Sequence, residues 1–263
     1  MRETLAPVLL NRKAAKIRKA TGSETPRDIK ANGDLSAAQV LGRAILRPTK
    51  MLIFSPIVLL LSLYIAFVFG LIFLLFTTFP AVFEATYGFG PGTAGLAYLG
   101  LGLGMAAGVI LLGKMSDRLM KKPADGGVAR PEQRLRLMIW LSPIVPVGFF
   151  WYGWAAERHA HWIVPILGTW FIGLGAFSLV VPSQIYFVDA FGSQAAASAL
   201  AANMVCRNLF GTFLPLAGDP LYDRLGLGWG NSLLGFIGLV FIPVPLLFYR
   251  YGGWLRDRFP VDY

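Results

Sequence analysis

The sequence predicts an all-α integral membrane protein, a bundle of six transmembrane helices, and three observations support this fold class. Hydrophobic residues make up 56% of the 263 residues and charged residues only 14%, whereas soluble domains carry about a quarter charged residues. The apolar residues gather in long runs, each able to cross a hydrocarbon core of about 30 Å as a helix. The charged residues lie between these runs, which is typical of membrane proteins.

Residues 1–50 are polar and basic, and they are predicted to form a cytoplasmic segment. Near its start, apolar residues such as Leu5 and Leu9 alternate with basic residues such as Arg12 and Lys16. This pattern predicts a short amphipathic helix that rests on acidic lipid head groups, and a helix that binds a protein partner is the alternative.

Six spans are predicted within residues 51–250, followed by a cytoplasmic tail over 251–263. Each span has close to the number of apolar residues, about 20, that a helix needs to cross the bilayer. The first run is longer, and Gly70 and Pro80 allow it to bend. The predicted spans are about 53–80, 93–113, 135–155, 162–187, 195–217 and 231–250.

Basic residues are distributed unequally between the two sides of these spans. One side holds the first segment, a basic loop between the second and third spans, and the tail, whereas the other side holds only Arg158 and Arg224. Lysine and arginine are retained on the cytoplasmic side of membranes. An even number of spans therefore places both termini in the cytoplasm.

Other function classes find little support. The formal net charge of +10 does not indicate nucleic-acid binding, because the basic residues are not interleaved with aromatic residues on one face. His159 and His161 have no third ligand nearby, so no metal site is predicted. No G-x-S-x-G, H-E-x-x-H or P-loop pattern occurs, and we expect neither enzyme activity nor a bound cofactor.

A stripe of small residues lies in the second predicted span. Gly100, Gly104 and Gly108 recur every four residues and so share one helix face. Such a stripe lets two membrane helices approach closely. The same stretch matches G-x-G-x-x-A, but a dinucleotide site needs that pattern between a strand and a helix. Helix packing is therefore the predicted role.

Arg207 lies in the middle of the fifth predicted span, where a charge is costly unless it faces a cavity or a partner. Asn203 and Gly211 are each four residues away, so the three form one polar helix face. This face is a candidate lining of a substrate path. The alternative is an arginine whose side chain extends toward the cytoplasmic surface.

Other candidates for a substrate cavity lie in the fourth and first spans. Gln184 is a hydrogen-bonding residue near the cytoplasmic half of the fourth span. Tyr64, Phe67 and Phe76 are aromatic residues of the first span that are able to form an aromatic wall. Aromatic residues at helical spacing also serve helix packing, and that role stays open for these three.

Four segments together resemble a known family: Glu3–Ala14, Gly113–Arg118, Ser198–Gly218 and Gly228–Gly235. They resemble, in order, the start of the central cytoplasmic loop, the second-half copy of the loop motif, the eleventh span and the entry into the twelfth. The family is that of the fungal twelve-span drug:proton antiporters of the major facilitator superfamily. The resemblance implies that the six spans correspond to spans seven to twelve, the C-terminal half of a major facilitator fold.

The resemblance also implies a role for the loop motif Gly113, Asp117 and Arg118 in conformational switching. In the family, the aspartate at the position of Asp117 packs near a helix terminus from the opposite half, where its charge favours a helix N-terminus. A well-structured cytoplasmic turn without this role is the alternative.

The expected function is proton-coupled multidrug efflux across the plasma membrane by alternating access, in a truncated or half-size chain. The proton gradient is the expected coupling force, with no cofactor. Expected partners are the lipid bilayer, small amphipathic substrates and either a missing N-terminal half or a second copy of the chain, with no nucleic acid. The alternative function is a non-transporting fragment, or a structural or regulatory partner of another transporter half.

Overall fold

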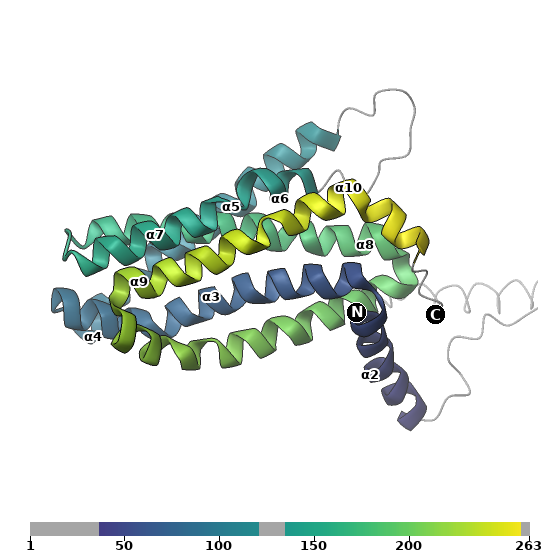
Figure 1. Cartoon of the computed structure of the whole chain (residues 1–263), viewed down its shortest axis with the longest axis horizontal. Helices are drawn as coiled ribbons and strands as arrows, with labels where there is room; N and C mark the ends of the chain where they lie inside the picture. The colour runs from purple at the N-terminus through teal and green to yellow at the C-terminus, as the bar shows by residue number, and fades with distance from the viewer. Residues whose placement is uncertain (1–36, 121–134, 259–263) are drawn as a thin grey trace, which may run out of the picture. The chain divides into compact units, whose positions relative to one another are not determined.

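The structure is a computed structural model that describes residues 37–120 and 135–258 (Figure 1). The chain divides into two compact units, Met1–Leu46 and Arg47–Tyr263. Of the first unit, only the beginning of α2 (Ala37–Phe54) is described. The amphipathic helix predicted near the start of the chain therefore lies outside the described residues, as do residues 259–263 of the predicted cytoplasmic tail.

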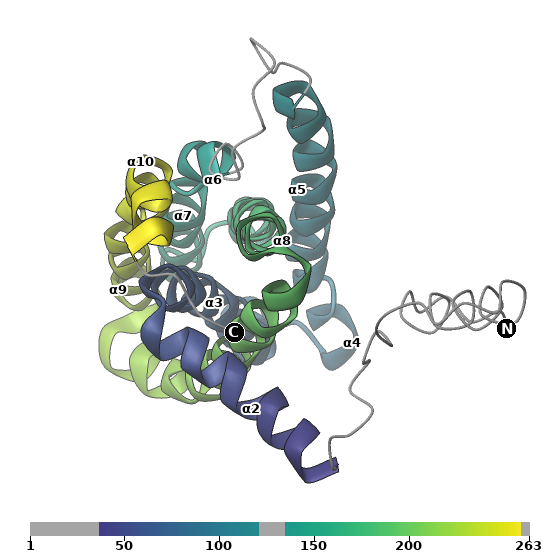
Figure 2. The ribbon, with the colours of Figure 1, turned by 90° about the vertical axis from the view of Figure 1, so that its right-hand side faces the viewer.

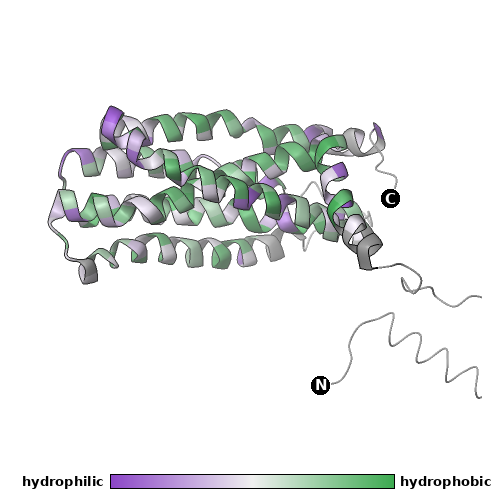
Figure 3. Ribbon diagram, turned by 90° about the horizontal axis from the view of Figure 1, so that it is seen from below, coloured by the Kyte–Doolittle hydropathy of each residue, from purple (hydrophilic) through white to green (hydrophobic). Residues whose placement is uncertain are grey.

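All elements in the described ranges are helical, in agreement with the predicted all-α class. Hydrophobic residues cover most of the length of the helices, and hydrophilic residues gather toward helix ends (Figure 3). After α2 come α3 (Pro56–Tyr87), α4 (Pro91–Ala94), α5 (Ala97–Met120), α6 (Leu135–Leu141), α7 (Ile144–Glu157), α8 (Ile163–Phe213), the 3₁₀ turn η3 (Pro215–Ala217), α9 (Gly218–Phe241) and α10 (Pro243–Arg258).

Five helical stretches of the described residues are long and apolar enough to cross a membrane, judged by length and composition. They are Pro56–Tyr87, Gly92–Met115, Leu135–Glu157, Ile163–Gly192 and Ala195–Trp254. The last stretch has 60 residues. One straight helix of that length would measure about 90 Å, about three times the hydrocarbon core. The sequence predicted two spans in this stretch. Within it, the α-helix is interrupted by the 3₁₀ turn η3 and by the non-helical backbone at Gly226.

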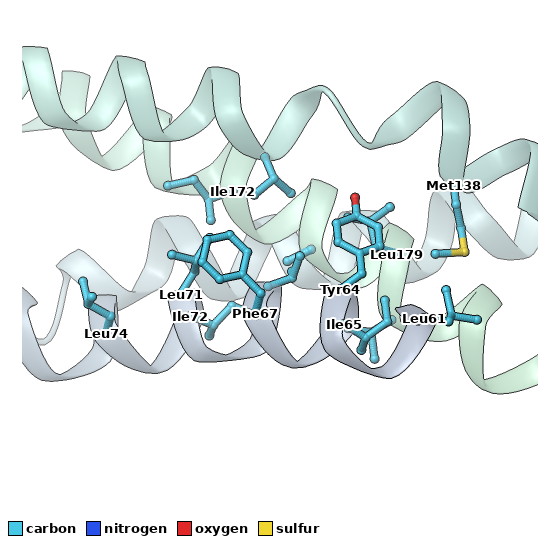
Figure 4. Close-up of a cluster of buried hydrophobic side chains, with 14 of the residues drawn as sticks. Leu61, Tyr64, Ile65, Phe67, Leu71, Ile72, Leu74, Met138, Ile172 and Leu179 are labelled. Atoms are coloured by element: carbon cyan, nitrogen blue, oxygen red, sulfur yellow. The ribbon is translucent and has the colours of Figure 1, made fainter. Parts of the chain in front are cut away.

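Helix α3 provides much of the apolar core of the second unit. The helix begins where Ser55 Oγ accepts a hydrogen bond from the Val58 N–H over 3.5 Å, and it ends at Gly88, whose φ of 67° favours glycine. Its buried side chains pack against residues of α6 and α8 (Figure 4). These include Leu61, Tyr64, Ile65, Phe67 and Leu71.

Three helical stretches extend beyond the predicted boundaries. The first span was predicted to end near Pro80, but α3 continues to Tyr87. The second was predicted to end near residue 113, but α5 continues through Gly113 to Met120, because no proline interrupts it there. Helix α2 occupies a segment for which the sequence predicted no helix. Hydropathy marks where a helix leaves the bilayer, and this is not where the helix ends.

Glycines hold α5 and α7 close to α8. A Cβ atom added at Gly104 of α5 would collide with the carbonyl oxygen of Trp170. In the opposite direction, a Cβ at Gly173 of α8 would collide with the carbonyl oxygen of Leu101. On the α7 side, a Cβ at Gly148 would lie 2.6 Å from Ile172. Both helices therefore approach the α8 backbone at distances that only glycine allows, and Figure 2 shows α8 between them.

Gly192 divides α8 into two arms, residues 163–191 and 193–213, which lie side by side. Its φ of 65° and ψ of 178° are not helical. In a straight helix, Gln184 and Asn203 would be about 28 Å apart. The 3.0 Å hydrogen bond between their side chains shows that the chain reverses direction between the arms.

Gly226 divides α9 in the same way, with φ 72° and ψ 175°. The side chain of Glu157, at the end of α7, accepts hydrogen bonds from the backbone N–H groups of Leu227 (2.8 Å) and Gly228 (3.1 Å). Its carboxylate thus caps the second part of α9 and satisfies donors that a helix start leaves unpaired. These two hydrogen bonds fix the start of residues 227–241 against the end of α7.

Candidate functional site

The predicted polar face of the fifth span lies against the first arm of α8. Nε2 of Gln184 donates to Oδ1 of Asn203 over 3.0 Å. Asn203 is fully buried, and its Nδ2 has no hydrogen-bond partner in the described part of the chain. Two residues that the sequence singled out separately are therefore in contact, and one of them keeps a free donor.

Arg207 lies one helical turn beyond Asn203 and is half-buried. Its Cζ atom lies 4.4 Å from the ring centroid of Phe69 on α3, a cation–π contact. Its Nε is buried and has no hydrogen-bond partner among the described residues. At the next turn, a Cβ on Gly211 would lie 3.4 Å from the Phe69 ring. The polar face thus reaches from the first arm of α8 to α3.

The described acidic side chains are all exposed, and none of them forms a hydrogen bond with the Nε of Arg207. They are Glu84, Glu157, Asp189, Asp219 and Asp223. Within the described ranges, the guanidinium of Arg207 therefore meets an aromatic ring where a buried arginine ordinarily meets a carboxylate.

Tyr64 and Phe67 lie apart from this polar face. Both are buried, and both rings stack on Phe241 of α9, with centroids 5.6 and 5.2 Å apart. Figure 4 shows them among the apolar side chains of the core. In this conformation other helices cover the two rings, and their place in a substrate cavity stays a prediction.

Phe76 belongs to an aromatic row along α3 that begins beside Arg207. The row consists of Phe69, Phe73, Phe76 and Tyr98, with successive ring centroids 4.8, 5.8 and 5.7 Å apart. Phe73 is 38% exposed, so part of the row remains uncovered by the described helices. The aromatic row and the polar face together form the candidate site.

The loop motif has a helical backbone, because Gly113, Asp117 and Arg118 all lie within α5. From the sequence, a well-structured turn is the alternative to a switching role, and the backbone here is a helix and not a turn. A Cβ at Gly113 would have no heavy atom within 4 Å, so the glycine is not required by packing there. The side chains of Asp117 and Arg118 lie outside the described ones, and their role stays a prediction.

The glycine stripe of the second span lies on α5 and packs against α8. A Cβ at Gly100 would lie 2.5 Å from the Ile166 carbonyl oxygen, and one at Gly108 would lie 2.7 Å from that of Leu174. Sequence reasoning missed the facing glycine on α8, Gly173. Its spacing to Gly168 and Gly175 does not follow the four-residue pattern that identified the first stripe.

Sequence reasoning also missed Phe69, the residue on which Arg207 packs. Phe69 precedes Phe73 by four residues, so the helical spacing that selected the other aromatic residues also includes it. No local signal identifies Tyr98 or Phe241, because both reach α3 from other helices.

A metal centre finds no support in the described ranges, where no group of three or more His, Cys, Asp or Glu side chains could hold an ion. The ring of His161 lies 5.3 Å from that of Trp162. This places His161 next to an aromatic side chain at the start of α8.

The chain is similar in sequence to a protein family and to several known transporters. The family model described as the Major Facilitator Superfamily matches residues 5–215. The MFS transporter prlG of Fungal sp. (strain NRRL 50135) is 64% identical over 262 residues, which are 100% of this chain and 55% of that protein. The MFS-type transporter phm3 of Pyrenochaetopsis sp is 60% identical over 262 residues, 100% of this chain and 54% of that protein.

A more distant relative has a more informative name. The "Trichosetin biosynthesis cluster MFS transporter" of Gibberella fujikuroi is 51% identical over 264 residues, 100% of this chain and 48% of that protein. The chain thus spans about half the length of the curated relatives it matches. No solved structure matches the chain.

The prediction of a multi-pass membrane protein that is not an enzyme is confirmed by these matches and by the apolar helices of the structure. The family model covers most of the chain, and the relatives named above are transporters. The chain belongs to the Major Facilitator Superfamily.

Proposed function

We propose that the described helices form one six-helix half of a transporter that exports small amphipathic molecules by alternating access. Arg207 is the observation that carries this proposal. Its guanidinium lies in the middle of an apolar helix, packed on Phe69 and next to the buried Asn203. Charges inside membrane spans are costly and mark substrate or ion pathways more often than structural positions.

The six-span count rests on the break at Gly226. Before it, residues up to Gly218 run beside α3, where a Cβ on Gly218 would lie 2.9 Å from Thr78. After it, Gly235 lies beside Phe150 and Gly238 beside Pro146, so the chain returns antiparallel to α7. We therefore propose two spans in the 60-residue stretch. The resulting even number of spans supports the proposal that both termini lie in the cytoplasm.

The described spans correspond, in this proposal, to the C-terminal half of the fold. The resemblance of four segments to spans seven to twelve of the fungal drug:proton antiporters supports this position. The chain's length, about half that of its relatives, agrees with it. Rocking of two halves around a site near the bilayer midplane would then require a second six-helix unit.

The proposed coupling force is the proton gradient of the plasma membrane, without a cofactor. This follows the antiporter family that the sequence resembles. The proposed substrates are multidrug-type amphipathic molecules, and the relative named for a trichosetin biosynthesis cluster adds biosynthetic products to that class. An aromatic row with an uncovered ring suits such molecules, because apolar pockets with few polar groups bind them.

The non-transporting alternative is separated from this proposal by expressing the 263-residue chain alone and together with a first half from a relative. The proposal predicts export only when both halves are present. Export by neither combination would favour a structural or regulatory partner.

The role of Arg207 is tested in the complete two-half protein with a fluorescent dye as substrate. Arg207→Ala should reduce dye efflux by about tenfold or more while the amount of inserted protein is unchanged. Asn208→Ala is the matched control, because Asn208 is the next residue, is exposed, and is expected to retain efflux. Equal efflux from both variants would remove Arg207 from the mechanism.

A further inference from the structure

We propose that the polar face of Gln184, Asn203 and Arg207 binds an acidic group, so that the exported molecules are amphipathic organic anions. This inference rests on the proposed export function and adds the chemical class of the substrate. It depends on three features of the site: the kind of polar group left free, the absence of a buried opposing charge, and the aromatic surface beside it.

The first feature is that both free polar groups are donors. Asn203 Nδ2 and Arg207 Nε are buried, and neither has a hydrogen-bond partner in the described part of the chain. The two residues are one helical turn apart, which places them about 6 Å from each other. A buried donor without an acceptor is unfavourable, and acceptor oxygens of one acidic ligand can relieve both.

Gln184 fixes the orientation of this pair. Its Nε2 donates to Oδ1 of Asn203, and the Nδ2 donor of the same amide has no partner among the described residues. The buried groups left unpaired at this position are therefore N–H donors, which acceptor oxygens of a ligand can satisfy.

The second feature is the charge. The described acidic side chains are exposed, and none of them lies buried beside Arg207. An arginine stays charged in proteins, and in an apolar surrounding its charge acts strongly on a ligand. A cationic substrate would be repelled there, whereas an anion would gain both the charge interaction and the charge-assisted hydrogen bonds.

The third feature is the apolar surface that continues from the guanidinium. Phe69 lies under Arg207, and Phe73 lies next to Phe69 with 38% of its surface exposed. Gly211 has no side chain that could cover these rings. A molecule with a flat or apolar body can therefore lie on the aromatic row. The donors of Arg207 and Asn203 are buried in this conformation, so its acidic group would reach them when alternating access opens this face.

The test compares two probes with the same carbon skeleton, a fluorescent amphipathic carboxylate and its methyl ester. They are offered to the complete two-half protein in proteoliposomes with a proton gradient. Wild-type protein should transport the carboxylate about tenfold or more faster than the ester at low probe concentration. Arg207→Gln should abolish this preference, and Arg207→Lys should retain part of it.

Two variants and one physical measurement accompany this comparison. Asn203→Leu should weaken carboxylate transport more than ester transport, whereas the exposed Asn208→Ala should leave the ratio unchanged. The carboxylate should also raise the unfolding temperature of the purified wild-type protein, and it should not do so for Arg207→Gln. This shift reports binding without transport.

The outcomes separate the inference from the function on which it rests. Transport of both probes at equal rates would contradict the anion site and leave the export function standing. Equal loss of both probes in Arg207→Gln would contradict it too, because Arg207 then serves a carboxylate of the protein's other half. Transport of neither probe, with no shift in unfolding temperature, would contradict both proposals.

Discussion

The hydroxyl of Tyr98 on α5 donates to the carbonyl oxygen of Phe76 on α3 over 2.8 Å. This carbonyl is the one that Pro80, four residues later, cannot pair, because proline has no N–H. The unpaired carbonyl would otherwise face an apolar surrounding, where it is costly. Tyr98 therefore explains why α3 continues through Pro80 to Tyr87, and it joins α3 to α5.

Tyr98→Phe removes this donor and keeps the ring. The free energy of unfolding should fall by about 1–2 kcal/mol, because a partly buried carbonyl loses its partner. Thermal unfolding of the detergent-purified chain measures this change. The control is Tyr249→Phe, which alters an exposed tyrosine and should be nearly neutral.

Pro80→Ala restores an N–H that can pair with Phe76. In this background Tyr98→Phe should cost less than in the wild type, and the difference is the coupling energy of a double-mutant cycle. Equal costs of Tyr98→Phe in the two backgrounds would show that the hydroxyl does not serve this carbonyl.

Gly104→Ala should destabilise the protein by about 2 kcal/mol or more, because the added methyl group collides with the carbonyl of Trp170. Gly102→Ala is the matched control on the same helix, since nothing lies within 4 Å of a Cβ there. That control should be neutral or slightly stabilising. Size-exclusion chromatography of fluorescently tagged protein compares the two, and equal profiles would contradict the close α5–α8 contact.

Glu157→Ala should lower the free energy of unfolding by about 0.5–1 kcal/mol, because it removes the cap on the backbone N–H groups of Leu227 and Gly228. Glu157→Gln should lower the free energy of unfolding less than Glu157→Ala does, because the amide oxygen still accepts the two hydrogen bonds. The remaining loss comes from the missing negative charge at the helix start. Glu84→Ala, at an exposed acidic position, is the control. Similar unfolding temperatures for the alanine variants of Glu157 and Glu84 would argue against the cap.

Gly192→Ala should destabilise the protein by about 1–3 kcal/mol, because φ 65° with ψ 178° is a conformation available almost only to glycine. The variant should also separate Gln184 from Asn203, and so reduce transport in the complete protein. Gly102→Ala, at an uncrowded helical glycine of α5, serves as the control for both measurements. If Gly192→Ala were as stable and active as the control, the chain would not reverse direction at Gly192.

The fold class was predictable because apolar run length alone determines which segments can cross a bilayer. Helix ends were less predictable. Pro80 suggested an end near that position, but the donor that compensates for it comes from Tyr98, on another helix. Such a long-range partner leaves no trace in the local sequence.

The candidate site was predictable in its polar residues and not in its geometry. Asn203 and Arg207 were identified because helical periodicity places them on one face. The contact of Asn203 with Gln184 depends on the reversal at Gly192, whose positive φ no hydropathy pattern reports. The covering of Tyr64 and Phe67 depends on Phe241 of α9, far away in the chain.

The most direct test asks whether the face of Arg207 and Gly211 lines a water-filled path. In the complete protein with Cys206→Ala, a single cysteine is introduced on that face as Gly211→Cys, and others as Met204→Cys and Asn208→Cys at exposed positions off that face. A membrane-impermeant maleimide should label Gly211→Cys during turnover, and substrate should slow that labelling. Labelling of Met204→Cys and Asn208→Cys alone, with position 211 protected, would contradict the assignment of this face to a transport path.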